Sequence, residues 1–209
     1  MSKHGIQITS SRVGKLEKEL IQYTLNLPKS SVGLDLGAGN GFISIIISLL
    51  QKNIYLYDLK INFKLKIFQK IFSSNKLHLR KKNLKNVDYV DFPKNIDFVY
   101  SARFLHYLTY LEAENLLRKF SKNMKSGAKI FITVSGIDSD IGKNYSCSEK
   151  IISERNCFIS KLNQSRFEIK EKVTLYTKKE LEILMENYFI IEKSWESDFK
   201  NIFIIGVKK

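Results

Sequence analysis

The sequence has no apolar run long enough to cross a membrane, and it has little cysteine or proline. Its longest apolar segment, 42–50, spans nine residues, whereas a membrane helix needs roughly 20. The first residues lack the charged and then apolar pattern of a secretory signal. Cys147 and Cys157 are ten residues apart, with no C-x-x-C pattern and no nearby histidine. We therefore expect reduced thiols in a cytoplasmic protein, and neither a disulfide nor a zinc or other metal site.

Positive charge is abundant, but it comes mainly from one residue type. The 209 residues carry a net charge of +14, and lysine supplies 29 of the 35 basic side chains. Phosphate and base recognition favour arginine, so an excess of lysine is weak evidence for a nucleic-acid partner. The block 60–85 nevertheless contains nine basic residues and no acidic one. It is either a solvated surface or a face for an anionic partner such as RNA.

Three glycines spaced two apart follow an apolar run that ends in a carboxylate. The run places Asp35 just before Gly37, Gly39 and Gly41, and an apolar segment long enough for a helix begins at Phe42. A strand, a glycine turn and a helix bring free backbone N–H groups up to a nucleoside-bearing ligand. The spacing is G-x-G-x-G, which differs from the G-x-G-x-x-G of dinucleotide-binding proteins.

Predicted strands and helices alternate around this turn. We expect helices at 12–25, 42–51, 60–72, 109–123 and 177–187, and strands at 31–36, 54–58, 77–82, 96–101, 129–135, 188–195 and 202–207. Gly127 is expected to end the helix before the fifth strand. This order predicts one α/β domain over 1–209, Rossmann-like and doubly wound, with a mostly parallel seven-stranded sheet and a C-terminal antiparallel hairpin.

One segment, 136–176, interrupts the alternation. It is polar and too long for an ordinary connection inside a compact domain. Apolar residues at helical spacing favour a helix over 148–162, followed by an extended piece over 167–175. We expect this 136–176 insertion to cover the binding site of a substrate.

The glycine turn, Asp35 and the terminal hairpin resemble class I S-adenosylmethionine-dependent methyltransferases of the small-molecule type. The resemblance covers roughly residues 30–135. It implies S-adenosyl-L-methionine as cofactor, S-adenosyl-L-homocysteine as product, and an N-terminal helical segment (1–29) over the cofactor site. The implied cofactor-binding residues are Asp35, Gly37, Ala38, Gly39, Asn40, Gly41, Asp58, Leu59, Asn83, Leu84, Ser101 and Ala102.

Some of these residues also have plainer interpretations. Asp58 lies 17 residues beyond Gly41, close to the spacing of a carboxylate that binds ribose hydroxyls, but it is also placed to cap a helix. Asp35 either contacts the cofactor or buttresses the turn, and Asn83 is either a ligand contact or an ordinary turn residue. His106 is a candidate general base because its pKa naturally lies near neutrality. It is also a candidate structural histidine.

The expected reaction is in-line transfer of a methyl group to an oxygen or nitrogen of a small-molecule acceptor. Candidate pocket aromatics are Tyr23, Tyr107, Tyr145 and Tyr176, and further candidates by location are Arg12, Asp138 and Asp140. The segment after the fourth strand has no Asn/Asp-Pro-Pro clamp, which argues against methylation of adenine N6. Two alternatives stay open: an RNA methyltransferase that uses the 60–85 face, and a non-catalytic protein that binds S-adenosylmethionine. No membrane partner is expected.

Overall fold

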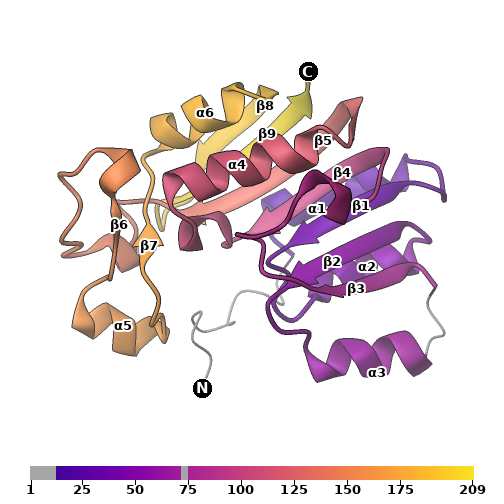
Figure 1. The fold of residues 1–209 in the computed structure, drawn as a ribbon, viewed down its shortest axis with the longest axis horizontal. Helices are drawn as coiled ribbons and strands as arrows, with labels where there is room; N and C mark the ends of the chain where they lie inside the picture. The colour runs from indigo at the N-terminus through magenta and orange to yellow at the C-terminus, as the bar shows by residue number, and fades with distance from the viewer. Residues whose placement is uncertain (1–12, 72–74) are drawn as a thin grey trace.

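A computed structural model of the chain describes residues 13–71 and 75–209. Its main sheet has seven strands in the order β3-β2-β1-β4-β5-β9-β8 (Figure 1). The strands are β1 Val32–Leu36, β2 Asn53–Asp58, β3 Leu77–Lys81, β4 Ile96–Ala102, β5 Met124–Ser135, β8 Phe189–Glu196 and β9 Asn201–Lys208. The first five are parallel to one another, whereas β9 is antiparallel to β5 and β8. The predicted parallel sheet with an antiparallel terminal hairpin is confirmed.

Helices cover both faces of the sheet. They are α1 Lys15–Leu25, α2 Phe42–Leu49, α3 Phe63–Ile71, α4 Tyr110–Ser121 and α6 Lys178–Glu186. One apolar cluster packs α1, α2 and α3 on Phe131, and another packs α4 and α6 on Ile130 and Ile132. Neighbouring residues of a strand point to opposite faces, so the two clusters lie on opposite sides, with α4 and α6 in front of the strands in Figure 1. Within the described residues no helix has the length and apolarity to span a membrane.

Two helices begin where the sequence predicts because their starts are held by local hydrogen bonds. The Thr109 hydroxyl accepts from the backbone N–H of Glu112 at 3.2 Å, and the Glu112 carboxylate accepts from the Thr109 N–H at 2.8 Å. Thr177 and Glu180 form the same reciprocal pair at the start of α6. Such capping boxes act within four residues, which is why they can be read from sequence.

Two local predictions are wrong. Gly127 does not end a helix, because α4 stops at Ser121 and β5 has already begun at Met124. With φ of +78°, Gly127 lies where β5 shifts its register against β4, as expected of a bulge. Helix α3 starts at Phe63 rather than at 60, following Asn62, whose side chain accepts from the Lys64 N–H at 2.9 Å.

The 136–176 insertion folds upon itself at one end of the sheet (Figure 1). It contains the short elements β6 Asn156–Cys157, α5 Lys161–Phe167 and β7 Val173–Thr174, packed around an apolar cluster of its own. The two ends of the insertion meet, because Gly136 bridges Tyr176 and the Ile137 N–H donates to the Tyr176 carbonyl at 2.8 Å. The insertion is thus closed at its base.

The helix predicted over 148–162 does not form. Instead, the buried Arg155 side chain donates to the Lys150 carbonyl through Nε (2.9 Å) and Nη2 (2.7 Å), and to the Leu175 carbonyl at 3.2 Å. These bonds tie the middle of the segment to residues on both sides of it. The chain therefore forms only a short 3-10 helix at Ile152–Glu154, enters β6 after Arg155, and becomes α-helical at Lys161.

The prediction of two reduced cysteines is also wrong, because Cys147 and Cys157 form a disulfide within the insertion. Their Cα atoms are 6.2 Å apart, a normal separation for a disulfide. Cys157 reaches Cys147 because β6 pairs with β7, while the Tyr145 hydroxyl donates to the Val173 carbonyl of β7 at 2.6 Å. Cys157 and the chain just before Cys147 are therefore both held by β7.

Candidate active site

The glycine turn between β1 and α2 has the backbone that the sequence predicts. Gly37, Gly39 and Gly41 have φ values of +72°, +56° and +68°, a region in which residues with a Cβ are strained. A Cβ on Gly37 would overlap the Phe104 side chain, and one on Gly41 would overlap Leu65. The turn therefore needs glycine both for its conformation and for the space around it.

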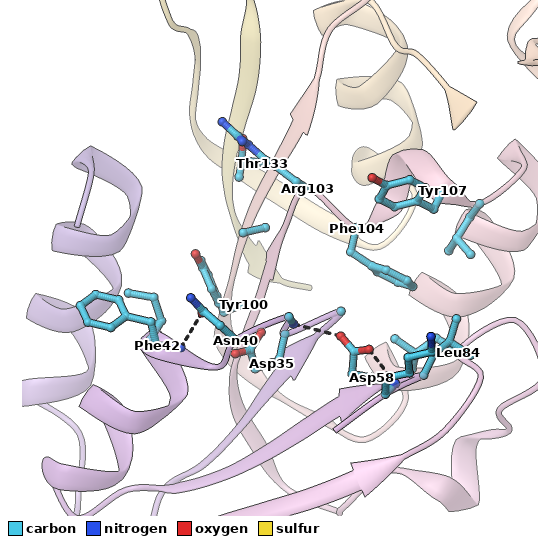
Figure 2. A pocket seen from close by; sticks show the side chains of 18 of the residues that line it. Asp35, Asn40, Phe42, Asp58, Leu84, Tyr100, Arg103, Phe104, Tyr107 and Thr133 are labelled. Atoms are coloured by element: carbon cyan, nitrogen blue, oxygen red, sulfur yellow. Dashed lines mark hydrogen bonds between the residues drawn. The ribbon is translucent and has the colours of Figure 1, made fainter. Parts of the chain in front are cut away.

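Asp58, at the end of β2, is joined to this turn. One carboxylate oxygen accepts from the Gly39 N–H at 2.9 Å, and the other accepts from the Lys60 N–H at 2.9 Å (Figure 2). These two bonds fix the orientation of the carboxylate at the cavity wall and leave further lone pairs for a ligand. Asp58 does not cap α3, which begins five residues later at Phe63.

Asp35 is almost fully buried at the base of the turn. Its carboxylate accepts from the Ser44 hydroxyl at 2.6 Å, which ties β1 to α2. Burial raises the pKa of Asp35 to about 7, the Ser44 hydrogen bond opposes the shift, and the negative charge of Asp58 adds to it. Asp35 thus buttresses the turn and also faces the cavity.

A cavity of about 1340 Å³ opens at the carboxyl edge of the parallel strands, which is where open α/β sheets bind ligands. Ten of the twelve predicted cofactor-binding residues line it, namely Asp35, Gly37, Ala38, Gly39, Asn40, Asp58, Leu59, Asn83, Leu84 and Ala102. Asn83 also stabilises a turn, because its side chain accepts a hydrogen bond from the Lys85 N–H at 3.1 Å.

Gly41 and Ser101 lie outside the lining. Ser101 is buried and donates to the Leu36 carbonyl at 3.2 Å, which joins β4 to β1. Of the four candidate aromatics only Tyr107 lines the cavity. Arg12 lies outside the described residues, and Asp138 and Asp140 are not part of the lining.

The remaining walls come from residues that the sequence did not single out. Helix α1 contributes Glu17, whose carboxylate accepts from the Tyr100 hydroxyl of β4 at 2.9 Å. The terminal hairpin contributes Trp195 and Phe203, whose rings stack with centroids 5.2 Å apart, and Lys15 lies over the Trp195 ring. In the sequence, Glu17 is 83 residues from Tyr100, and Lys15 is still farther from Trp195. Apart from the contact within the hairpin, no local sequence pattern therefore reveals these contacts.

The insertion closes the cavity from a further side. It contributes Asn156 and Phe158 from the end of β6, and Glu171 and Lys172 from the approach to β7. The ammonium of Lys172 lies 5.7 Å from the Phe158 ring centroid. Among the described residues no cluster of His, Cys, Asp and Glu has the arrangement of a metal site.

A family model described as a methyltransferase domain matches residues 10–188. The chain belongs to this family. Membership confirms the predicted class I S-adenosylmethionine-dependent methyltransferase, its enzyme class and its cofactor. A search of curated proteins gives no match.

Solved structures share the fold of this methyltransferase at low sequence identity. The PH0226 protein from Pyrococcus horikoshii OT3 is 19% identical with a TM-score of 0.71, covering 98% of this chain and 92% of that one. The 1,6-didemethyltoxoflavin-N1-methyltransferase from Burkholderia thailandensis, with S-adenosylhomocysteine bound, is 14% identical with a TM-score of 0.69, covering 96% and 79%. The N-methyltransferase NodS from Bradyrhizobium japonicum WM9 is 10% identical with a TM-score of 0.58, covering 93% and 88%.

In this methyltransferase His106 is buried and does not line the cavity. Its Nδ1 accepts from the Ser135 N–H at 3.4 Å, joining the segment after β4 to β5. Burial lowers the pKa of His106 to about 3, and the positive charge of Arg103 contributes. Its role as general base stays a prediction, and its burial and low basicity favour the structural interpretation.

This burial predicts how stability depends on pH. In the unfolded chain the pKa of His106 returns to about 6.5. Between pH 6.5 and 3 the unfolded state therefore binds a proton at His106 that the folded state does not bind. The folded state therefore loses stability as the pH falls through this window, by up to about 1.4 kcal/mol per unit. Urea unfolding at pH 7.5 and 5.0 is expected to show a smaller loss for His106→Gln than for the wild type. Equal losses would contradict a neutral buried histidine.

Proposed function

We propose that the protein transfers the methyl group of S-adenosylmethionine to an oxygen or nitrogen atom of a small molecule. The observation that carries this proposal is that a single cavity is lined both by Asp58 beside the glycine turn and by Phe158 of the insertion. A pocket bounded by aromatic side chains and closed by a folded segment suits a compact acceptor. The 1,6-didemethyltoxoflavin-N1-methyltransferase and NodS, which share the fold, are named as N-methyltransferases.

The residues at the Asp58 end fit the cofactor. The turn at Gly37 offers a surface without side chains that a Cβ would disrupt. Asp58 would accept hydrogen bonds from the ribose hydroxyls, and Leu59 and Leu84 would pack against the adenine. Asp35 would place its negative charge near the cationic part of the ligand. When bound, the cofactor supplies a methyl group that its sulfonium makes electrophilic.

The protein's own task is to align the acceptor and exclude water. Phe104 and Tyr107 form a wall next to Ala102, and Phe158 of the insertion adds an apolar surface. Burial raises the pKa of Tyr107, although the Arg103 charge opposes the shift, so this phenol stays protonated at neutral pH.

The 60–85 face gives little support to the alternative of an RNA substrate. Lys82 pairs with Asp91 at 2.8 Å, and Lys85 pairs with Glu112 at 3.2 Å, so acidic side chains outside the block already neutralise part of it. The exposed lysines of α3 remain, but they stand beside exposed apolar side chains such as Phe63 and Ile71.

Two measurements test the proposed function. Calorimetry is expected to show binding of S-adenosylmethionine and S-adenosylhomocysteine, and radiolabelled methyl transfer is expected to a member of a panel of phenols, amines and carboxylic acids. Activity on RNA that falls steeply with salt would favour the RNA alternative. Tight cofactor binding with no turnover on any acceptor would favour a non-catalytic protein.

The raised pKa of Asp35 predicts a pH dependence of cofactor binding. Below pH 7 the Asp35 carboxyl is largely protonated and neutral, whereas a cationic ligand stabilises its ionised form. The affinity for S-adenosylmethionine is therefore expected to rise with pH, by up to about tenfold per unit below pH 7, and to level off above it. Calorimetric titration from pH 5.5 to 8.5 measures this.

Two variants assign this pH dependence to Asp35. Asp35→Asn is expected to flatten the profile, because the amide does not titrate. Ser44→Ala is expected to move the midpoint to higher pH, because it removes the hydrogen bond that holds the pKa of Asp35 down. An unchanged slope in Asp35→Asn would show that another group is responsible.

A further inference from the structure

An arginine at the end of β4 faces the cavity, and the part of the chain that the structure describes gives it no ion-pair partner. Arg103 follows Ala102 directly and lines the cavity. Among the described residues, its guanidinium takes part in no hydrogen bond and no ion pair, and the Glu17 carboxylate acts on it only at longer range. Glu17 itself is already engaged by the Tyr100 hydroxyl and the Gly14 N–H, both at 2.9 Å.

The backbone of Arg103 holds it in this place. Arg103 has φ of +54°, a left-handed conformation that is costly for a residue with a long side chain. The conformation is anchored by a hydrogen bond of 2.7 Å from the Arg103 N–H to the Thr133 carbonyl of β5. A strained backbone that presents an unpaired cation to a cavity is typical of a ligand-binding residue.

Thr133 gives a second, independent observation at the same place. Its hydroxyl is buried and has no hydrogen-bond partner among the described residues, although the residue lines the cavity. Buried hydroxyls are normally paired. Figure 2 shows Thr133 and Arg103 at one end of the cavity, with Asp58 and Leu84 at the other.

We propose that the methyl acceptor carries an oxyanion, such as a carboxylate, which the Arg103 guanidinium and the Thr133 hydroxyl bind. The guanidinium presents parallel N–H donors that match the two oxygens of a carboxylate, and the hydroxyl adds a third donor. The aromatic rings of Phe104 and Tyr107 line the cavity as well, so the rest of the acceptor has a flat apolar surface. This inference rests on the proposed function and names its substrate class.

The test compares acids with their neutral analogues. The probes are hydroxy- and amino-substituted benzoates and the corresponding benzamides, titrated calorimetrically into protein saturated with S-adenosylhomocysteine. At least one benzoate is expected to bind about tenfold more tightly than its benzamide. Arg103→Gln is expected to abolish this preference, and Thr133→Val to reduce it severalfold. A panel in which no acid exceeds its amide overturns the proposal.

Matched variants separate Arg103 from the general charge of the cavity. Lys60→Met removes another cation of the cavity lining, beside Asp58, and is expected to keep the preference for acids. Arg103→Lys keeps the charge without the paired donors and is expected to retain part of the preference. A preference that survives in Arg103→Gln, or is lost equally in Lys60→Met, overturns the proposal.

Affinity for S-adenosylhomocysteine distinguishes this inference from the proposed function. Arg103→Gln is expected to bind it within twofold of the wild type. A tenfold loss would show that Arg103 holds the cofactor carboxylate, and would overturn the inference but not the function. If the wild-type protein binds no S-adenosylhomocysteine, the proposed function is overturned. The preference for acids can still be measured then, because the benzoates and benzamides can be titrated into the protein without that ligand.

Discussion

Replacing Asp58 by alanine is expected to weaken the binding of S-adenosylmethionine by about a hundredfold. Two charge-assisted hydrogen bonds to ribose hydroxyls are together worth roughly 3 kcal/mol. The substitution also frees the N–H groups of Gly39 and Lys60, which the carboxylate now holds at 2.9 Å each. The glycine turn would then lose part of its fixed geometry. Isothermal titration calorimetry measures the change.

Two further variants make this test specific. Asp58→Asn keeps the shape but offers one acceptor oxygen where the structure uses two, so an intermediate loss is expected. Asp198→Ala removes an exposed carboxylate in the β8–β9 turn, outside the cavity lining, and is expected to leave affinity unchanged. Equal affinity in Asp58→Ala and the wild type would exclude Asp58 from the cofactor site.

Replacing Arg155 by alanine is expected to cost about 3–5 kcal/mol of stability. The Arg155 side chain is buried and donates to the Glu180 carboxylate at 2.7 Å, in addition to its bonds with the Lys150 and Leu175 carbonyls. Breaking this partly buried ion pair leaves the Glu180 charge and the two carbonyl acceptors without the donors of a buried side chain, which is costly. For a chain of this size the melting temperature is expected to fall by about 10 °C, as measured by calorimetry.

The same insertion provides a control for Arg155. Arg166 lies 4.0 Å from Asp140, with both side chains exposed, and such surface pairs contribute at most about 1 kcal/mol. Arg166→Ala is therefore expected to change the melting temperature little. Asn156 and Phe158 flank the cavity just after Arg155, so Arg155→Ala is also expected to raise the acceptor KM while sparing cofactor affinity. Similar melting temperatures for the two variants would contradict this account.

The proposed cofactor end of the site was predictable because its determinants are local. The glycines of the turn, the spacing to Asp58 and the capping boxes at Thr109 and Thr177 act over a few residues or across adjacent strands. A strand that ends in a carboxylate and enters glycines has few other structures available to it. The parallel order then follows from the alternation of elements.

The proposed acceptor end was not predictable because its contacts join distant residues. The apolar spacing within 148–162 suits a helix, but Arg155, Tyr145 and the disulfide hold the chain through partners up to 28 residues away. The link between Glu17 and Tyr100 crosses 83 residues. For His106 the sequence identified the residue but gave no measure of its burial, which decides its basicity.

Because the insertion is closed at its base, changes within it are structurally separate from changes in the glycine turn. Its ends meet at Gly136 and Tyr176, and its interior packs around its own apolar side chains, with Tyr107 as a point of contact outside it. If the insertion holds the acceptor as proposed, substitutions there would reshape the pocket for a different acceptor while the glycine turn stays intact. New specificities would then arise in one part of the molecule without loss of the shared methyl donor.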